Sequence, residues 1–247
     1  MTGDFLLEIA VESVKAACAA ERGGAGRIEL CADLEVGGVT PREETMKEVR
    51  AALRIPIFAL IRPRGGDFIY SGEELDEMGN KIEEARNSRM DGVVLGVLTA
   101  DGQVDVEQTK KLVDQGQPMP VTFHRAFDAT NDLAKALEEV IATGAARILT
   151  SGGAPNAPHG IEQLRRLIEL AGDRIVVVPG GGLHADNVEA VEKATAAQEF
   201  HSGLGSVLKY GSSDLDRFEM EARKLSQKLS SLPHNQGEPA QSKTQRS

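Results

Sequence analysis

The chain has 247 residues, a formal net charge of −10 and 40% hydrophobic residues. This length and apolar content fit one domain around a single large core. The acidic balance leaves no surplus of Lys and Arg to attract nucleic acid or an anionic membrane surface, so we expect neither as a partner. The apolar runs are strand-sized and far shorter than the roughly 20 residues that a membrane helix needs.

The N-terminal sequence and the cysteines indicate a reducing compartment. Residues 1–4 lack the basic region and apolar stretch of a secretory signal, which predicts a cytoplasmic protein. Cys18 and Cys31 have no CxxC spacing and are too few for a disulfide framework, so we expect two free thiols.

Short apolar runs recur at intervals of roughly 25 to 30 residues, and a segment with helical spacing follows each run. The predicted strands are 5–10, 27–31, 57–62, 92–95, 121–124, 147–150, 175–178 and 199–201. The predicted helices include 43–53, 73–88, 105–115, 131–143, 161–171, 185–194 and 214–230. Thr40 and Ser71 are predicted to cap helix starts with their hydroxyls, and Gly116, Gly144 and Gly172 stand at predicted helix ends.

The spacing of these units predicts the fold class. Eight βα units within about 210 residues favour an α/β fold, a single (β/α)8 or TIM barrel, over an open doubly wound sheet. We expect residues 1–230 to form this domain. Residues 231–247 are rich in Gln, Ser, Pro and Gly, and we expect them to be a disordered tail.

Strand parity predicts which side chains point into the barrel, because successive side chains alternate between faces. The bulky Ile28 and Leu30 suit the helix-facing side, which turns Glu29 and Cys31 inward. Thr122 and Glu199 also point inward, farther from the loops. The residues expected at the C-terminal mouth, where barrel enzymes carry their active sites, are Glu8, Glu29, Cys31, Arg62, Arg64, His124 and His201.

A structural explanation stays open for each of these residues alone, because a barrel interior can hold a satisfied Glu and Arg pair. Several buried charges together cost desolvation that stability alone would not require, so the set indicates a functional site.

Three glycine-bearing loops, at residues 62–67, 150–153 and 179–182, could hold an anion. Residues 150–153 and 179–182 follow the sixth and seventh predicted strands, where barrels often bind phosphate. Ser151, Gly152, Gly181 and Gly182 would supply backbone N–H groups, and Arg62 and Arg64 would supply charge for a phosphate or carboxylate. The alternative is that these glycines only form tight turns.

Seven segments carry a family resemblance across about residues 5–210: 26–31, 37–41, 61–68, 91–98, 121–128, 147–152 and 201–202. In these segments the chain resembles the copper homeostasis protein CutC family. The resemblance implies a (β/α)8 barrel, a cytoplasmic location, a homodimer or homotetramer, and a role in copper homeostasis.

The first functional hypothesis is copper binding. A Cys31 thiolate is a soft ligand suited to Cu(I), with His201 or His124 as its partner. Copper is the only cofactor indicated, and the chain has no Met-rich or CxxC copper motif.

The second hypothesis is an enzyme acting on a small anionic or phosphorylated molecule, with Glu8, Glu29 or His124 moving a proton. Asp128 would orient Arg125 or His124, or cap the following helix. A scaffold without chemistry is a third hypothesis. The sequence leaves open whether the chain is an enzyme.

Overall fold

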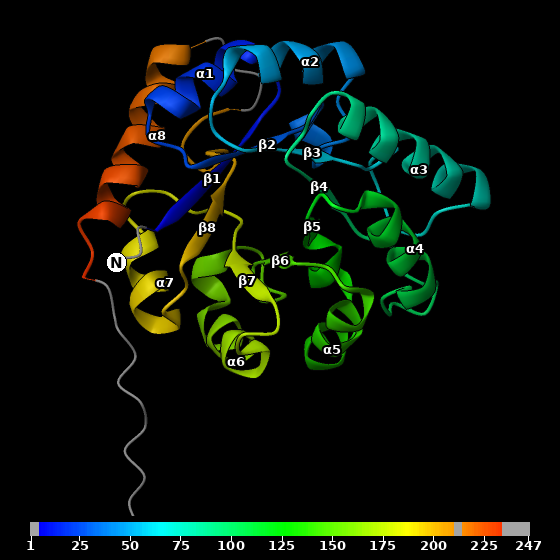
Figure 1. The fold of residues 1–247 in the computed structure, drawn as a ribbon. Helices are drawn as coiled ribbons and strands as arrows, with labels where there is room; N and C mark the ends of the chain where they lie inside the picture. Colours follow the sequence, from blue (N-terminus) through cyan, green and yellow to red (C-terminus); the bar gives the residue numbers. More distant parts are fainter. Residues whose placement is uncertain (1–4, 210–213, 234–247) are drawn as a thin grey trace, which may run out of the picture.

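The structure is a computed structural model, and it describes residues 5–209 and 214–233. Strands and α-helices alternate along this part of the chain (Figure 1). The strands are β1 (Leu6–Val11), β2 (Arg27–Leu30), β3 (Ile57–Leu60), β4 (Gly92–Leu95), β5 (Val121–Phe123), β6 (Arg147–Thr150), β7 (Val176–Pro179) and β8 (Glu199–Ser202). The α-helices are α1 (Val14–Arg22), α2 (Glu43–Ala52), α3 (Gly72–Asn87), α4 (Val106–Gly116), α5 (Leu133–Thr143), α6 (Ile161–Ala171), α7 (Val188–Thr195) and α8 (Leu215–Ser230). Three short 3-10 helices, η1 (Leu34–Val36), η2 (Arg125–Ala129) and η3 (Ala157–His159), lie in loops.

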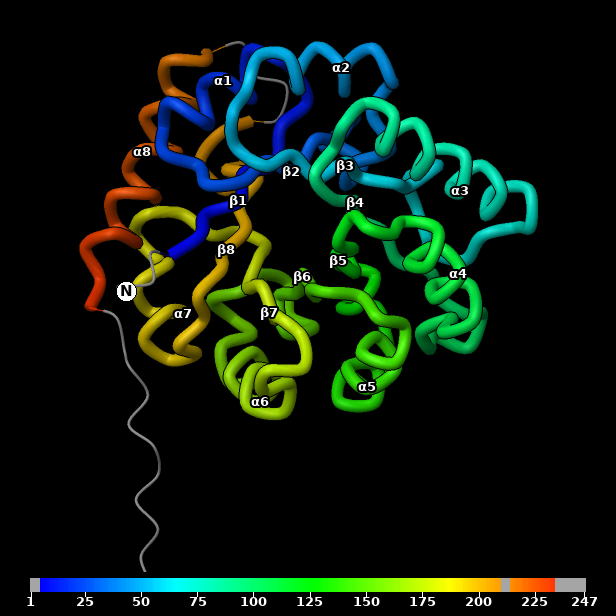
Figure 2. The backbone as a smooth tube through the Cα atoms, viewed as in Figure 1, coloured from blue at the N-terminus to red at the C-terminus, as the bar shows by residue number. Residues whose placement is uncertain are grey.

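All neighbouring strands in the sheet are parallel, in the order β7-β6-β5-β4-β3-β2-β1-β8. A bridge between Gly180 and His201 joins β7 to β8 and brings the sheet round on itself. The strands surround the centre and the helices lie outside them (Figure 1). Helices α1 and α8 pack side by side, so the first and last βα units meet (Figure 2). The predicted TIM barrel is confirmed.

Apolar side chains form two cores, as strand parity predicts. Ile28 and Leu30 lie in the large core between the strands and the helices. A smaller cluster fills the barrel itself and consists of Ala10, Cys31, Phe58, Leu60 and Val94. The inward direction predicted for Cys31 is therefore confirmed.

Of the two helix starts predicted from capping hydroxyls, one is confirmed and one is wrong. Ser71 forms a capping box with Glu74 at the start of α3, as predicted. The predicted cap at Thr40 is wrong, because α2 begins at Glu43 after Arg42, which makes no side-chain cap. The Thr40 hydroxyl instead accepts from the Arg62 N–H at 2.8 Å and donates to the Arg62 carbonyl at 3.0 Å.

Within the described ranges, no helix combines the length and apolar character that crossing a membrane requires. Of the predicted tail, residues 234–247 lie outside the described residues.

Candidate functional site

A cavity of about 370 Å³ opens where the strands end and the loops begin. Glu29 of β2 and His201 of β8 line one side of it, and Arg62, after β3, and His124, after β5, line another. Several glycines of the loops after β7 and β8 complete the wall. They are Gly181, Gly182, Gly203 and Gly205.

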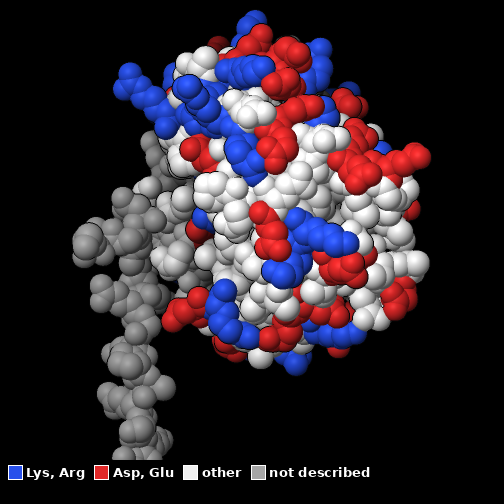
Figure 3. Space-filling model, turned by 45° about the vertical axis from the view of Figure 1, so that its right-hand side comes forward, with Lys and Arg blue, Asp and Glu red and all other residues white. Residues whose placement is uncertain are grey.

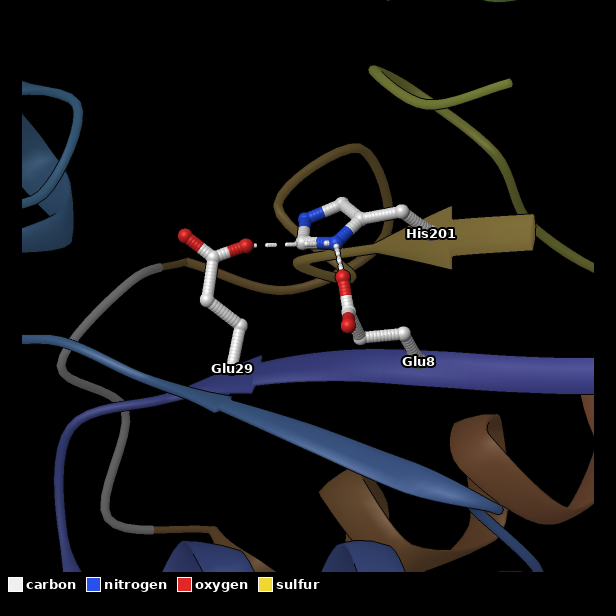
Figure 4. A group of neighbouring side chains, drawn as sticks. All are labelled: Glu8, Glu29 and His201. Atoms are coloured by element: carbon white, nitrogen blue, oxygen red, sulfur yellow. Dashed lines mark hydrogen bonds and ion pairs between the residues drawn. The ribbon is translucent and has the colours of Figure 1, made fainter. Parts of the chain in front are cut away.

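Glu8, Glu29 and His201 form a buried cluster on the adjacent strands β1, β2 and β8 (Figure 4). Parallel register places Glu8 opposite His201. The His201 Nδ1 atom lies 2.7 Å from Glu8 Oε1 and 3.3 Å from Glu29 Oε2. The three side chains are therefore one interacting group.

Burial and neighbouring charges give the two carboxyls of this cluster different pKa values. Burial would raise the pKa of Glu8, but the hydrogen bond with His201 and the charge of Arg27 lower it to about 2. Burial raises the pKa of Glu29 to about 7, despite the opposing charge of His201. For His201, burial lowers the pKa, but Glu29 and Glu8 outweigh it and raise the pKa overall. Glu29 is the carboxyl that exchanges a proton near neutral pH.

A second layer of charge lies below this cluster, toward the strand starts. Arg27 donates to Glu8 and, at 2.7 Å, to Glu199. Arg147 donates to Glu199 at 3.2 Å. Sequence reasoning missed Arg27 and Arg147 as inward residues. Parity was an available signal for Arg27, which stands two residues before Glu29 on the same strand.

Arg62 is a buried cation without an acidic partner. It is 5% exposed, and in the described part of the chain no carboxylate lies within ion-pair distance of it. Its guanidinium donates to the carbonyls of Gly38 at 2.9 Å and Gly66 at 2.8 Å, and it lies 4.8 Å from the centroid of the Phe68 ring. The charge of Arg62 is solvated by dipoles but not neutralised.

His124 is a buried imidazole that faces the same cavity. Its Nδ1 accepts a hydrogen bond from the Ala126 N–H at 3.2 Å, which leaves the ring proton of a neutral imidazole on Nε2. Burial and the charge of Arg62 lower the pKa of His124 to about 3. His124 is therefore a neutral hydrogen-bond donor.

The model of the CutC family matches residues 5–206. That span contains every side chain of the cavity and the cluster named above. The chain belongs to the CutC family. It is 43% identical to a CutC family protein of Chromobacterium violaceum over 235 residues, covering 91% of this chain and 95% of that one. It is 46% identical over 202 residues to the human copper homeostasis protein cutC homolog, covering 82% of this chain and 74% of that one.

The solved structure of a CutC protein from Streptococcus agalactiae has the same fold. It superposes with a TM-score of 0.77 at 32% identity and covers 81% of this chain and 98% of that one. The barrel seen here is therefore the CutC barrel.

The CutC barrel brings most of the predicted mouth residues together. Glu29, Arg62, His124 and His201 line the cavity, and Glu8 contacts His201 from below. Gly181 and Gly182 also line it. Arg64 does not. Its guanidinium is bonded to Glu74 at 2.6 Å and to Asp67 at 3.0 Å, outside the cavity.

The predicted anion loop at 150–153 holds a carboxylate of the protein itself. The N–H groups of Ser151 and Gly153 donate to Asp128 at 3.1 and 3.0 Å, and the Gly152 N–H donates to Thr150 Oγ1 at 2.8 Å. Asp128 also accepts from Arg125 Nε at 2.8 Å. Of the roles left open for Asp128, the structure shows the orientation of Arg125. Neither Ser151 nor Gly152 offers a free backbone donor to a ligand.

Cys31 was expected to share a metal with His201, but it is not in the described group of residues that could hold an ion. The described His, Cys, Asp and Glu residues that could jointly hold an ion are Glu8, Glu29 and His201, without Cys31. The Cys31 thiol donates to the Val11 carbonyl at 3.5 Å. Burial and the charge of Glu29 raise its pKa well above the usual value, which disfavours the thiolate. Two carboxylates and an imidazole suit a divalent ion better than Cu(I).

Proposed function

We propose that this CutC-family chain is an enzyme that binds a small anionic or phosphorylated molecule in the cavity and moves a proton by acid/base chemistry. The observation that carries the proposal is Arg62, a buried cation at the cavity wall without an ion pair in the described chain. A buried charge of this kind is costly unless an anion completes it.

The two walls of the cavity carry different chemical groups. Arg62 and His124 follow β3 and β5 and present hydrogen-bond donors. Glu29 and His201 come from β2 and β8, and the pKa of Glu29, about 7, allows this carboxyl to exchange a proton. When Arg62 and His124 hold the anionic group of a ligand, the rest of that ligand faces Glu29 and His201.

Glu29 is the best candidate for the proton-transfer group. Its pKa of about 7 allows it to take or give a proton at neutral pH. Glu8 remains ionised because of Arg27 and His201, and it orients the imidazole of His201. Glu8 is therefore a positioning residue in this proposal.

The test of the anion site is thermal unfolding with inorganic phosphate as the probe. A ligand that binds the native state stabilises it, by about 2.7 kcal/mol at 100 times its Kd. We expect phosphate to raise the Tm of the wild type and of Arg64→Gln, but not of Arg62→Gln. The Arg64 control removes a nearby arginine that is already paired. An equal rise for Arg62→Gln would contradict the proposal.

A second candidate function is copper binding, with copper as cargo. The name of the human relative supports it, and so does the buried Glu8, Glu29 and His201 group. The Cu(I) site expected at Cys31 with His201 would need the thiol to lose its proton.

Copper retention after anaerobic Cu(I) loading and after Cu(II) loading separates these sites. Loss of Cu(I) in Cys31→Ser supports the thiolate site, and loss of Cu(II) in Glu29→Gln supports the carboxylate site. Wild-type protein that keeps neither ion after desalting contradicts both.

The cytoplasmic location and the homodimer or homotetramer implied by the family belong to this proposal. Light scattering on the purified protein gives the subunit number directly, and a monomer would contradict the expected assembly.

A further inference from the structure

Arg62 and His124 each present an unpartnered polar atom, and both side chains contact the same aromatic ring. Within the described residues, Arg62 Nε and His124 Nε2 are buried and have no hydrogen-bond partner. Phe68 contacts both groups, with its ring centroid 4.8 Å from the Arg62 guanidinium carbon and 4.9 Å from the centroid of the His124 ring. Buried donors without a partner are costly, so their occurrence at a cavity wall indicates a missing acceptor.

The surroundings of His124 leave one role for its free nitrogen. The bond from the Ala126 N–H to Nδ1 fixes the tautomer, so Nε2 carries the proton and donates. Gly96 gives the ring room, because a Cβ there would lie 2.6 Å from Nδ1. With Phe68 on the ring as well, the imidazole is held in place. A fixed neutral N–H recognises an oxygen acceptor without adding a charge.

We propose that the Nε2–H of His124 binds a carbonyl oxygen next to the anionic group held by Arg62, so the cavity selects a small anion that carries a carbonyl, of the 2-oxo acid class. This inference rests on the proposed function and deepens it. Both donors line the same cavity and contact the same Phe68 ring, so one small ligand with an anionic group and a carbonyl can meet both. His124 is then a specificity-determining residue that binds the substrate.

A neutral donor at this position also has a chemical consequence. It stabilises an oxygen that gains negative charge during a reaction, because the preorganised N–H dipole lies in a site shielded from water. The low pKa of His124, about 3, keeps this donor neutral across the physiological range. His124 is thus better suited to binding the substrate oxygen than to carrying a proton.

The experiment compares 2-oxobutyrate with butyrate, which differ only by the carbonyl. Dissociation constants come from NMR titration of the histidine side chains, of which the chain has 5. We expect the wild type to bind 2-oxobutyrate about ten-fold more tightly than butyrate, the effect of a hydrogen bond worth about 1.4 kcal/mol. We also expect the His124 Nε2 proton signal to shift downfield only with 2-oxobutyrate.

Three variants assign the preference to His124. His124→Phe should bind both acids with equal affinity, because it lacks the donor. His124→Gln places an amide N–H near the same position and should recover part of the preference. His159→Gln is the matched control, since His159 lies on η3 and is bonded to Asn156 outside the cavity.

The outcomes separate this inference from the proposed function. If the wild type binds both acids equally and Arg62→Gln binds neither, the carbonyl site is overturned and the anion site at Arg62 still stands. No binding of either acid contradicts both proposals. A preference that survives in His124→Phe overturns the role of His124. If that variant does not fold, an unshifted His124 Nε2 proton in the wild type with 2-oxobutyrate overturns it equally.

Discussion

Phe58 fills the lower part of the barrel between two guanidinium groups. The ring centroid lies 4.9 Å from the guanidinium carbon of Arg27 and 5.1 Å from that of Arg147. Gly92 on β4 makes this possible, because a Cβ there would lie 2.6 Å from the Phe58 ring atoms. The glycine is needed for a close approach of side chains and not for a turn.

We therefore expect Gly92→Ala to destabilise the protein by about 1 to 3 kcal/mol through overpacking of the barrel. Gly72→Ala is the matched control, because nothing lies within 4 Å of a Cβ at that position in α3. Urea unfolding measures the free energy of unfolding of both variants. Equal free energies of unfolding for the two variants would contradict the role given to Gly92.

Arg27 neutralises a carboxylate that is almost completely buried. Arg27→Met leaves the Glu8 charge without its cation, and we expect a loss of about 3 to 5 kcal/mol in the free energy of unfolding. Adding Glu8→Gln to this variant should recover part of the loss. Arg22→Met, which breaks the more exposed pair with Glu219, should cost at most about 1 kcal/mol. A similar cost for Arg22→Met and Arg27→Met in chemical unfolding would refute this ranking.

At the scale of elements, Asp128 connects η2 to the loop after β6. Its carboxylate accepts from Ser151 N–H, Gly153 N–H and the Thr150 hydroxyl. Asp132, four residues later, only caps α5 through the N–H groups of Ala134 and Lys135. The two aspartates have different structural roles despite their proximity in sequence.

Asp128→Ala should cost more stability than Asp132→Ala, for which a cap loss of about 1 kcal/mol is expected. Removing the Asp128 acceptor leaves several donors unpaired, at about 1 to 3 kcal/mol each if they stay buried. Hydrogen exchange should show faster exchange of the Ser151 and Gly153 amides in Asp128→Ala alone. Unchanged protection of these amides would show that Asp128 does not hold the loop.

The bounds of several elements follow from local sequence. The predicted ranges 92–95, 147–150 and 161–171 coincide with β4, β6 and α6. The third strand was predicted to reach residue 62 but ends at Leu60. The Arg62 N–H donates to the Thr40 hydroxyl and not to a neighbouring strand, a contact between segments that local sequence does not reveal.

At the scale of the whole molecule, acidic and basic side chains are interspersed on the face shown in Figure 3. Acidic and basic side chains also pair along helices of the molecule, as Lys47 does with Glu43 and Lys193 with Glu189. On that face no large area carries a single sign.

The stability of the whole molecule should depend on pH through Glu29. Its pKa is about 7 in the folded protein against an ordinary value of 4.5, so the folded state binds more protons between these values. The free energy of unfolding therefore falls as the pH rises from 4.5 to 7, by at most about 1.4 kcal/mol per pH unit for this group. Glu29→Gln should flatten the profile in this window.

Glu8 has the opposite effect on the free energy of unfolding, which it makes rise with pH in a lower pH range. Its folded pKa of about 2 gives stability that is present above 4.5 and is lost as the pH falls toward 2. Denaturant unfolding of the wild type, Glu29→Gln and Glu8→Gln across pH 3 to 8 checks both signs. A wild-type profile parallel to that of Glu29→Gln between pH 4.5 and 7 would contradict the raised pKa.

The sequence by itself determined the barrel and the direction of several of its inward residues. The regular βα spacing and the two-residue period of strands are local properties, so Glu29, Arg62, His124 and His201 could be placed at one mouth. Only the tertiary structure decided which residues these side chains contact. Glu8 and His201 are 193 residues apart in the chain, and the closure of β8 onto β1 joins them. Likewise, the path of η2 brings the Asp128 carboxylate to the loop after β6. Burial keeps the Cys31 thiol protonated. Strand register, loop path and desolvation all depend on segments that lie far apart in the sequence.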